Sequence, residues 1–265
     1  MKEYLKSSEI IDFNTSLEIM LLAKKLAAEA RDQAGFVKIA FEYVRDKIAH
    51  SADINQGATE AVPVTSGPAD GDISRIAHQE IKCNPADGDV SRIAHQEIKC
   101  NPADGDISRI AHQKVTCKAS EVLREGQGIC YAKSHLLAAI LRCNGVPAGF
   151  CYQRLILDDV WFPHLVLHGL NAVFLEKRWV RLDARGNKPG VYTRFSLKQE
   201  MLAFHVRREK GEEDLQQIFA EPDKNVIHAL TSHKNFKALW ANLPTELWKE
   251  DGDKQPPPSG KIIFT

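Results

Sequence analysis

The sequence lacks the features that mark membrane, secreted or nucleic-acid-binding proteins. Its N-terminus has no apolar stretch of the signal-peptide kind, and its longest apolar runs, such as residues 136–141 (LLAAIL), are far too short to cross a bilayer. Neither charge is in excess, because 35 Lys and Arg balance 35 Asp and Glu, and no strongly basic block occurs. We therefore expect a cytoplasmic protein that binds neither a membrane nor nucleic acid.

Cysteine is scarce as well. The chain has six cysteines in 265 residues, at positions 83, 100, 117, 130, 143 and 151. In an intracellular protein these are expected to be reduced thiols, and the first three fall in a repeat, which weakens a disulfide interpretation further. The hydrophobic share of 43% and the charged share of 26% are typical of a globular protein with a substantial core.

A tandem repeat of period 17 stands out at residues 67–83, 84–100 and 101–117. The first two copies differ at only two positions, which indicates a recent duplication. Each copy begins with a Pro-Ala-Asp-Gly-Asp turn and is too short for a standard solenoid unit. With the linker before it, the repeat is interpreted as an insertion over residues 51–117 that interrupts a single domain of residues 1–245. Residues 246–265 are predicted to be a mobile tail.

Each repeat copy contains a histidine and a cysteine that could be offered to a metal. These are His78 and Cys83, His95 and Cys100, and His112 and Cys117. The His-x4-Cys spacing is not a usual zinc pair, and the Asp-Gly-Asp turn lacks the full EF-hand ligand pattern. A surface insertion is the favoured interpretation, with a metal-binding or scaffolding arm as the alternative. We predict no metal site and no cofactor.

The remaining chain alternates helical and strand patterns. Helices are predicted over residues 14–30, 34–50, 118–128 (with Ser120 as cap), 130–142, 196–204 and 223–242, and strands over 150–157, 164–175 and 178–184. The helices cluster on either side of one block of strands.

Cys130 is the cysteine with the surroundings of a nucleophile. It lies in residues 126–135 (GQGICYAKSH), where a predicted helix begins on the cysteine itself. Unpaired N–H groups and the positive end of the helix dipole favour a thiolate there, and the N–H of Cys130 could donate to an oxyanion. Gly126 and Gly128 would let the backbone approach a substrate carbonyl. A buried, purely structural cysteine is the competing interpretation.

The other cysteines are poorer candidates. Cys143 falls at the C-terminal end of the same helix, where the dipole disfavours a thiolate. Cys151 lies in an apolar strand and is expected in the core. Cys83, Cys100 and Cys117 are interchangeable copies in the repeat.

A thiolate nucleophile needs a base, and the base needs an orienting acceptor. His168 and Asp183 lie at the two ends of a strand, tight Glu-Lys turn and strand, so the hairpin is expected to bring them together. His164, four residues earlier, is the rival base. A structural histidine is the competing interpretation.

The order Gly-x-Gly-x-Cys, Asn-Gly-Val-Pro-Ala-Gly-Phe and His…Trp-Val-x-Leu-Asp resembles the transglutaminase-like superfamily of papain-type cysteine enzymes. The resemblance covers roughly residues 14–54 and 117–245. It implies an α+β fold of the papain-like or transglutaminase-like kind, with N-terminal helices and a central cysteine-bearing helix packed on an antiparallel sheet. It also implies Cys130 as nucleophile, His168 as base and acid, and Asp183 as the residue that orients the histidine.

The expected activity is attack on an amide or peptide-like carbonyl through a thioester, with a peptide or protein as substrate. Hydrolysis and transamidation both fit, and hydrolysis is favoured because no acceptor site is readable. The second oxyanion donor is not assigned, although Gln127 and aromatic residues upstream of it are candidates. A non-catalytic peptide-binding module on the same fold is the alternative from another functional class.

Overall fold

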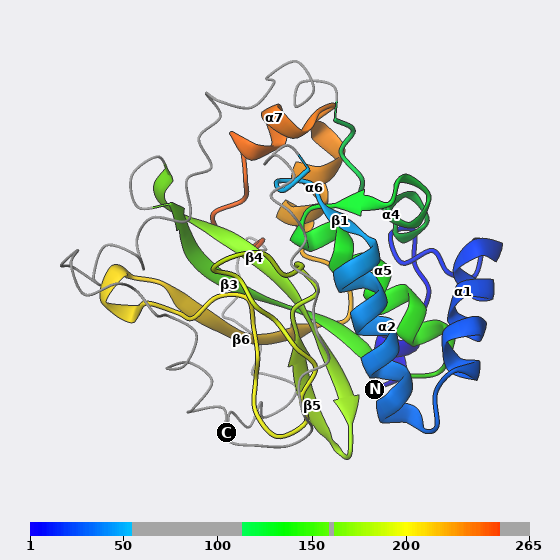
Figure 1. Cartoon of the computed structure of the whole chain (residues 1–265). Helices are drawn as coiled ribbons and strands as arrows, with labels where there is room; N and C mark the ends of the chain where they lie inside the picture. The colour runs from blue at the N-terminus through cyan, green and yellow to red at the C-terminus, as the bar shows by residue number, and fades with distance from the viewer. Residues whose placement is uncertain (55–112, 159–161, 250–265) are drawn as a thin grey trace, which may run out of the picture.

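The computed structural model describes residues 1–54, 113–158 and 162–249. Within these ranges the chain forms an α+β fold in which helices cover a four-stranded antiparallel sheet (Figure 1). In chain order, the elements are η1 (Lys2–Leu5), α1 (Leu17–Ala28), α2 (Gln33–Lys47), β1 (Ala49–His50), α4 (Ala119–Glu125), β2 (Gln127–Gly128), α5 (Cys130–Cys143), β3 (Ala148–Asp158), β4 (Phe162–Leu175), β5 (Arg178–Leu182), η4 (Arg208–Lys210), β6 (Glu213–Phe219), α6 (Lys224–Ser232) and α7 (Phe236–Trp240). The predicted fold class is confirmed.

The four-stranded sheet has the order β5-β4-β3-β6, and every neighbouring pair is antiparallel. Strands β4 and β5 form the predicted hairpin, whose two turn residues, Glu176 and Lys177, have φ values of 47° and 64°. Positive φ at both central residues defines the tight turn whose twist matches that of the strands it joins. This hairpin carries His168 on its first strand and places Asp183 directly after its second.

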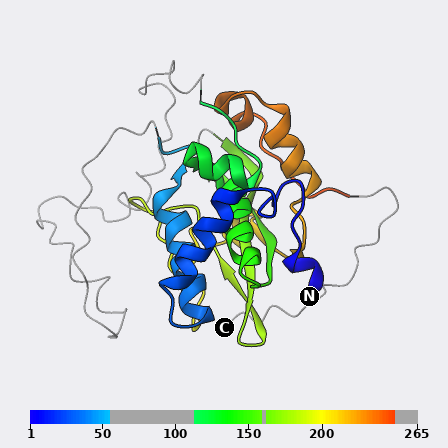
Figure 2. The ribbon, with the colours of Figure 1, turned by 90° about the vertical axis from the view of Figure 1, so that its right-hand side faces the viewer.

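Helix α5 is the centre of the molecule. Every residue from Cys130 to Arg142 is buried, because α1 and α2 pack against the helix on one side and the sheet covers the other. Figure 2 shows this layering, with α1 and α2 in front of α5 and the strands behind. A helix buried on all sides is fixed in position by its neighbours, and so is the cysteine at its start.

The first two helices match their predictions closely. The Ser16 side chain accepts a hydrogen bond from the Ile19 N–H at the start of α1, and Asp32 accepts one from the Gly35 N–H at the start of α2. Each cap satisfies an N–H group that has no partner inside its helix. Leu26 of α1 and Phe41 of α2 are among the residues that these helices bury in the core.

The cap of helix α4 lies two residues earlier than predicted, so Ser120 is not the cap. The cap position is Lys118, and the Glu121 carboxylate accepts from the N–H of both Cys117 and Lys118. Ser120 lies inside the first turn, where its N–H and hydroxyl both donate to Asp12.

The predicted helix over residues 196–204 does not form. Its backbone groups bond to side chains of the sheet instead: the Leu197 carbonyl accepts from Arg178, and the Ala203 N–H donates to Asp183 Oδ2 at 3.1 Å. Glu200 pairs with the buried Arg181 at 2.6 Å. These tertiary partners outweigh the helical periodicity of the segment.

The predicted helix over residues 223–242 is two helices, α6 and α7. The break occurs because Asn235 pairs with Lys114 in a β-bridge and caps α7 by accepting from the Ala238 N–H at 2.9 Å. Strand β6 was not predicted. It lies at the sheet edge and contains no fully buried residue, so it lacks the apolar alternation that identifies a strand.

The last residues of the third repeat copy belong to the folded core. The Gln113 amide donates to the Ser51 carbonyl, the Thr116 hydroxyl donates to the Gln127 carbonyl at 3.1 Å, and Cys117 is buried. The earlier parts of the repeat and most of the predicted tail lie outside the described residues. Trp248, which the sequence assigns to the tail, donates its N–H to Asp223 Oδ2 at 2.9 Å.

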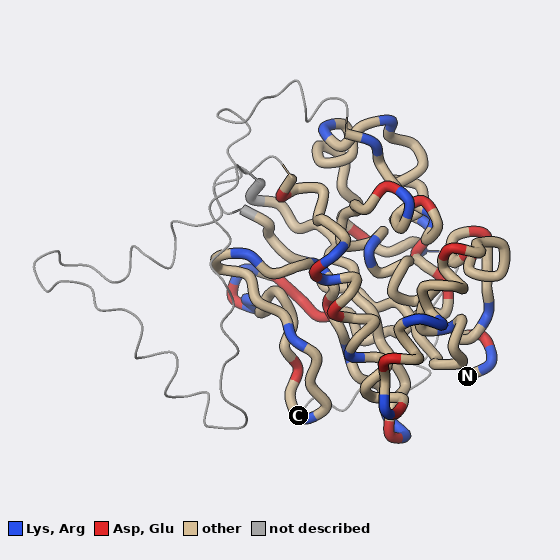
Figure 3. Tube along the Cα trace, turned by 45° about the vertical axis from the view of Figure 1, so that its right-hand side comes forward, with Lys and Arg blue, Asp and Glu red and all other residues tan. Residues whose placement is uncertain are grey.

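Positive and negative side chains are intermingled along the described chain (Figure 3). No helix among the described residues is long and apolar enough to span a bilayer.

Candidate active site

Cys130 is the first residue of α5, as predicted, and only 6% of it is exposed. The two glycines before it have structural roles in the fold. Gly126 ends α4 in the left-handed conformation, with φ of 64°. Gly128 packs against α5, where an added Cβ would lie 3.0 Å from the Ala132 Cβ.

His168 and Asp183 meet as the hairpin predicts. His168 Nε2 lies 2.8 Å from Asp183 Oδ2, and the two residues are 3% and 1% exposed. Asp183 also accepts from the backbone N–H of Arg185 at 3.1 Å, through Oδ1, and from that of Ala203. Burial would raise the pKa of this carboxyl, but the positive charge of His168 and these three hydrogen bonds lower it below the usual value and keep the carboxylate ionised.

A glycine allows α5 to approach His168 closely. A Cβ added to Gly169 would lie 2.6 Å from Tyr131 Cδ1, so only glycine fits between the helix start and strand β4. The Tyr131 hydroxyl donates to the Leu167 carbonyl, and Asn171 Nδ2 donates to the Ser134 carbonyl at 3.0 Å. Contacts on both sides of Gly169 thus fix Cys130 beside His168.

The electrostatics of His168 depend on both partners. Burial alone would lower its pKa, but the charges of Asp183 and Cys130 and the hydrogen bonds to both raise it to about 10. Because Nε2 binds Asp183, Nδ1 is the ring nitrogen left to face Cys130. The imidazole therefore holds a proton on the side of the sulfur.

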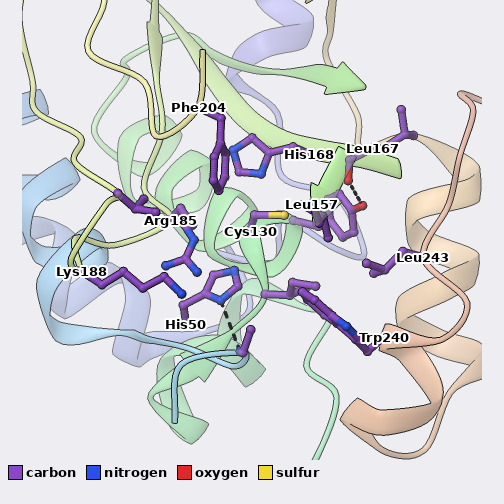
Figure 4. Close-up of a pocket in the computed structure, with 14 residues that line it drawn as sticks. His50, Cys130, Leu157, Leu167, His168, Arg185, Lys188, Phe204, Trp240 and Leu243 are labelled. Carbon is purple, nitrogen blue, oxygen red and sulfur yellow. Dashed lines mark hydrogen bonds between the residues drawn. The ribbon is translucent and has the colours of Figure 1, made fainter. Parts of the chain in front are cut away.

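Cys130 and His168 line one cavity together with apolar side chains (Figure 4). The ring of Phe204 meets the His168 ring edge to face at 5.1 Å. Trp240 and Leu243 form the wall near α7, and this segment is held at β4 because the Leu167 N–H donates to the Pro244 carbonyl at 2.7 Å. The full lining is His50, Ala52, Ile129, Cys130, Tyr131, Leu157, Leu167, His168, Arg185, Lys188, Val191, Phe204, Trp240 and Leu243.

Three polar residues of this cavity were not identified from the sequence: His50, Arg185 and Lys188. Arg185 and Lys188 both pair with Asp53, at 2.5 Å and 2.9 Å. The sequence signal that could have found His50 is its place in residues 44–54, which the family resemblance already covers. Gln127, the candidate oxyanion donor, is not among the residues that line this cavity, and its Oε1 accepts from Gln113 at 2.6 Å.

The residues considered as alternatives to His168 and Cys130 do not line the cavity. His164 is exposed. Cys151 is fully buried, and burial raises the pKa of its thiol, as it does for Cys143. Burial raises the pKa of the Cys117 thiol to about 12.

The other proposed metal ligands of the repeat, residues 78, 83, 95, 100 and 112, lie outside the described residues. Across residues 1–54, 113–158 and 162–249, no group of three His, Cys, Asp or Glu side chains is placed to hold a metal ion.

Comparison with known proteins finds a family match over part of the chain. Residues 86–184 match the family model of the transglutaminase-like superfamily, a range that contains Cys130, His168 and Asp183. No curated protein matches the chain. Among solved structures, the "Putative Cysteine Protease from Cytophaga hutchinsonii" is similar with a TM-score of 0.39 and 13% identity. That similarity covers 69% of this chain but only 40% of the other, a likeness too distant to bear on function.

Proposed function

We propose that this chain is a transglutaminase-like cysteine enzyme acting on amide or peptide-like carbonyls, and the match of residues 86–184 to the model of that superfamily supports the proposal. Cys130 is the nucleophile, His168 the general base and acid, and Asp183 the residue that orients His168. The product of the first step is a thioester on Cys130.

One observation carries this proposal: the buried series of Asp183, His168 and Cys130 at one wall of a cavity. A structural histidine would be satisfied by Asp183 alone. Here the second ring nitrogen of His168 faces a thiol at the start of a helix, where N–H groups without helical partners also point. Nucleophile, proton carrier and oxyanion donors then converge on one place where a carbonyl carbon fits.

The reaction follows from these positions. The Cys130 sulfur forms a bond to the carbonyl carbon, and the π pair moves to the oxygen. His168 then gives its Nδ1 proton to the departing nitrogen as the C–N bond breaks. In the second step His168 takes a proton from water, the hydroxyl oxygen attacks the thioester, and the sulfur leaves. Asp183 stays ionised throughout and fixes the ring orientation.

The proposal is tested by labelling with an activity-based thiol probe, followed by mass-spectrometric identification of the labelled residue. We expect rapid labelling at Cys130 and none in Cys130→Ala. The matched control is Cys143→Ala, which removes a half-buried thiol from the other end of α5 and should leave labelling unchanged. Slow labelling of Cys130, at the rate of an ordinary thiol, would contradict an enzymatic role. Peptide binding without turnover in the wild type would support the non-catalytic binding module instead.

A further inference from the structure

We propose that His50 is a catalytic residue of this site, whose Nε2–H donates a hydrogen bond to the oxyanion formed when Cys130 attacks a carbonyl. This inference rests on the proposed function and supplies the side-chain oxyanion donor that the sequence leaves unassigned. It assigns to His50 a role as a neutral hydrogen-bond donor, distinct from the acid and base role of His168.

The fold holds His50 beside the nucleophile. Strand β1 pairs in parallel with β2, so that His50 lies opposite Gly128, two residues before Cys130. The Ser51 N–H donates to the Gly128 carbonyl at 3.2 Å, which fixes this register directly after His50. The side chain is only 7% exposed and lines the same cavity as Cys130 and His168.

Two charged contacts secure the segment on either side of His50. Before it, the buried Lys133 donates to the carbonyls of Ile48 and Arg45, where α2 ends. After it, Asp53 pairs with Arg185 through two hydrogen bonds of 2.5 and 2.9 Å. Lys133 belongs to α5, three residues after Cys130, so the helix that carries the nucleophile also positions the strand that carries His50.

The hydrogen bonds of His50 define which nitrogen carries the proton. The Ala52 N–H donates to Nδ1 at 3.3 Å, so Nδ1 offers its lone pair and the proton resides on Nε2. Nε2 has no hydrogen-bond partner among the described residues. In Figure 4 this nitrogen lies on the opposite side of the ring from the Ala52 contact, toward the part of the cavity that holds Cys130.

The surroundings keep the ring neutral. Burial lowers the pKa of His50 well below its usual value, and the positive charges of Arg185, Lys133, His168 and Lys188 lower it further. A neutral ring with Nδ1 occupied cannot act as a base, because its lone pair already accepts the Ala52 N–H. It can donate through Nε2, and it retains that proton throughout the reaction.

The role is therefore restricted to charge stabilisation. When the sulfur–carbon bond forms, the carbonyl π pair becomes an oxyanion, and the Nε2–H joins the backbone N–H groups at the start of α5 in donating to it. When the C–N bond breaks, the oxygen pair reforms the carbonyl and the hydrogen bond weakens. A donor of this kind stabilises the acylation transition state and has no effect on a reaction that forms no oxyanion.

That distinction provides the test. Two reactions of Cys130 are compared in the full chain: acylation by p-nitrophenyl acetate, which forms an oxyanion, and alkylation by iodoacetamide, which does not. In His50→Ala we expect acylation to fall by about 10²-fold, as for the loss of one oxyanion donor, while alkylation stays near the wild-type rate. His50→Gln, whose side-chain amide can place an N–H near the Nε2 position, should recover part of the acylation rate.

The outcomes separate this inference from the proposed function. Acylation of His50→Ala at the wild-type rate would overturn the role of His50, and so would a parallel loss of acylation and alkylation, which would indicate a structural effect on the thiol. If His50→Ala unfolds, His50→Gln is compared with His50→Phe, whose side chain cannot donate a hydrogen bond. Equal acylation rates in these two variants, at equal alkylation rates, would also refute the role. Slow alkylation of Cys130 in the wild type would instead contradict the proposed nucleophile.

Discussion

His50 and His168 line the same cavity, and their pKa values are shifted in opposite directions. The pKa of His168 is raised to about 10, since the negative charges of Asp183 and Cys130 outweigh its burial. The pKa of His50 is lowered, since burial is reinforced by positive charges that include His168 itself. The cavity thus holds one protonated and one neutral histidine, which is the separation that the proposed acid–base chemistry and oxyanion binding require.

The first prediction concerns the dependence of acylation on pH. A protonated His168 persists until the pH rises through its pKa of about 10, so wild-type acylation should decline only near that pH. Asp183→Asn removes the charge that raises this pKa. We expect the alkaline decline to move to lower pH and the rate to fall by about 10²–10⁴-fold. The measurement is the rate of acylation by an amide, such as a p-nitroanilide, from pH 6 to 10.5, because the departing amine requires the His168 proton.

Asp223→Asn is the matched control for that experiment. Asp223 is also a buried carboxylate that accepts backbone N–H groups, but it caps α6. Its replacement should leave the alkaline decline in place. A decline at the same pH in Asp183→Asn and the wild type would show that Asp183 does not control His168.

The second prediction concerns the close contact between α5 and β4. Gly169→Ala would place a Cβ 2.6 Å from Tyr131 Cδ1, and Tyr131 is fully buried. We expect the free energy of unfolding to fall by about 1–3 kcal/mol and Cys130 to lose its reactivity as the helix start moves from His168. Urea unfolding and iodoacetamide labelling measure the two effects.

Gly145→Ala is the control, because it introduces backbone strain at a position far from Cys130. Gly145 has φ of 72° with open space around it, at the far end of α5. Alanine there should lower the free energy of unfolding by about 1 kcal/mol and leave iodoacetamide labelling of Cys130 unchanged. Equal labelling in Gly169→Ala and Gly145→Ala would refute a role for Gly169 in placing Cys130.

The third prediction concerns stability against pH. Burial lowers the pKa of Lys133 from 10.5 to about 7, so between these values the unfolded chain binds more protons and stability rises with pH. His168 acts in the opposite direction: its pKa is raised from 6.5 to about 10, so its contribution to stability is lost as the pH rises through this range. The two effects oppose each other in the wild type.

Lys133→Met removes one of these opposing contributions. We expect its free energy of unfolding, from urea titrations at pH 7, 8.5 and 9.8, to fall with pH more steeply than that of the wild type. Lys25→Met, which replaces an exposed lysine of α1, should keep the wild-type slope. Identical slopes for Lys133→Met and the wild type would contradict the depressed pKa of Lys133.

The fourth prediction concerns the repeat. Deletion of residues 67–100 removes two copies and retains the residues that contact the core, including Gln113, Thr116 and Cys117. We expect an unchanged melting temperature and an unchanged rate of Cys130 acylation. Deletion of residues 67–117 should instead destabilise the fold, because it also removes the Gln113 amide that donates to Ser51 and the buried Cys117. Equal effects of the two deletions would contradict the assignment of residues 113–117 to the folded domain.

Local signals in the sequence were strong enough to predict most elements that position the site. The caps and apolar stripes of α1 and α2, the start of α5 at Cys130 and the β4–β5 hairpin all depend on neighbouring residues along the chain. The hairpin also fixed the pairing of His168 with Asp183, because a tight turn brings residues on its two strands to neighbouring positions. Residues 196–204 show where such local prediction fails. Their apolar residues have helical spacing, but their hydrogen-bond partners are distant in the sequence and hold the segment in a non-helical conformation.

The sequence by itself determined the α+β class, the helix that begins at Cys130 and the hairpin that joins His168 to Asp183. Only the tertiary structure placed His50 opposite Gly128 and Ala203 against Asp183, because these contacts join segments separated by 78 and 20 residues. It also decided the charge states of the two histidines. A pKa depends on burial and on every charge packed nearby, and neither can be read from the order of residues along the chain.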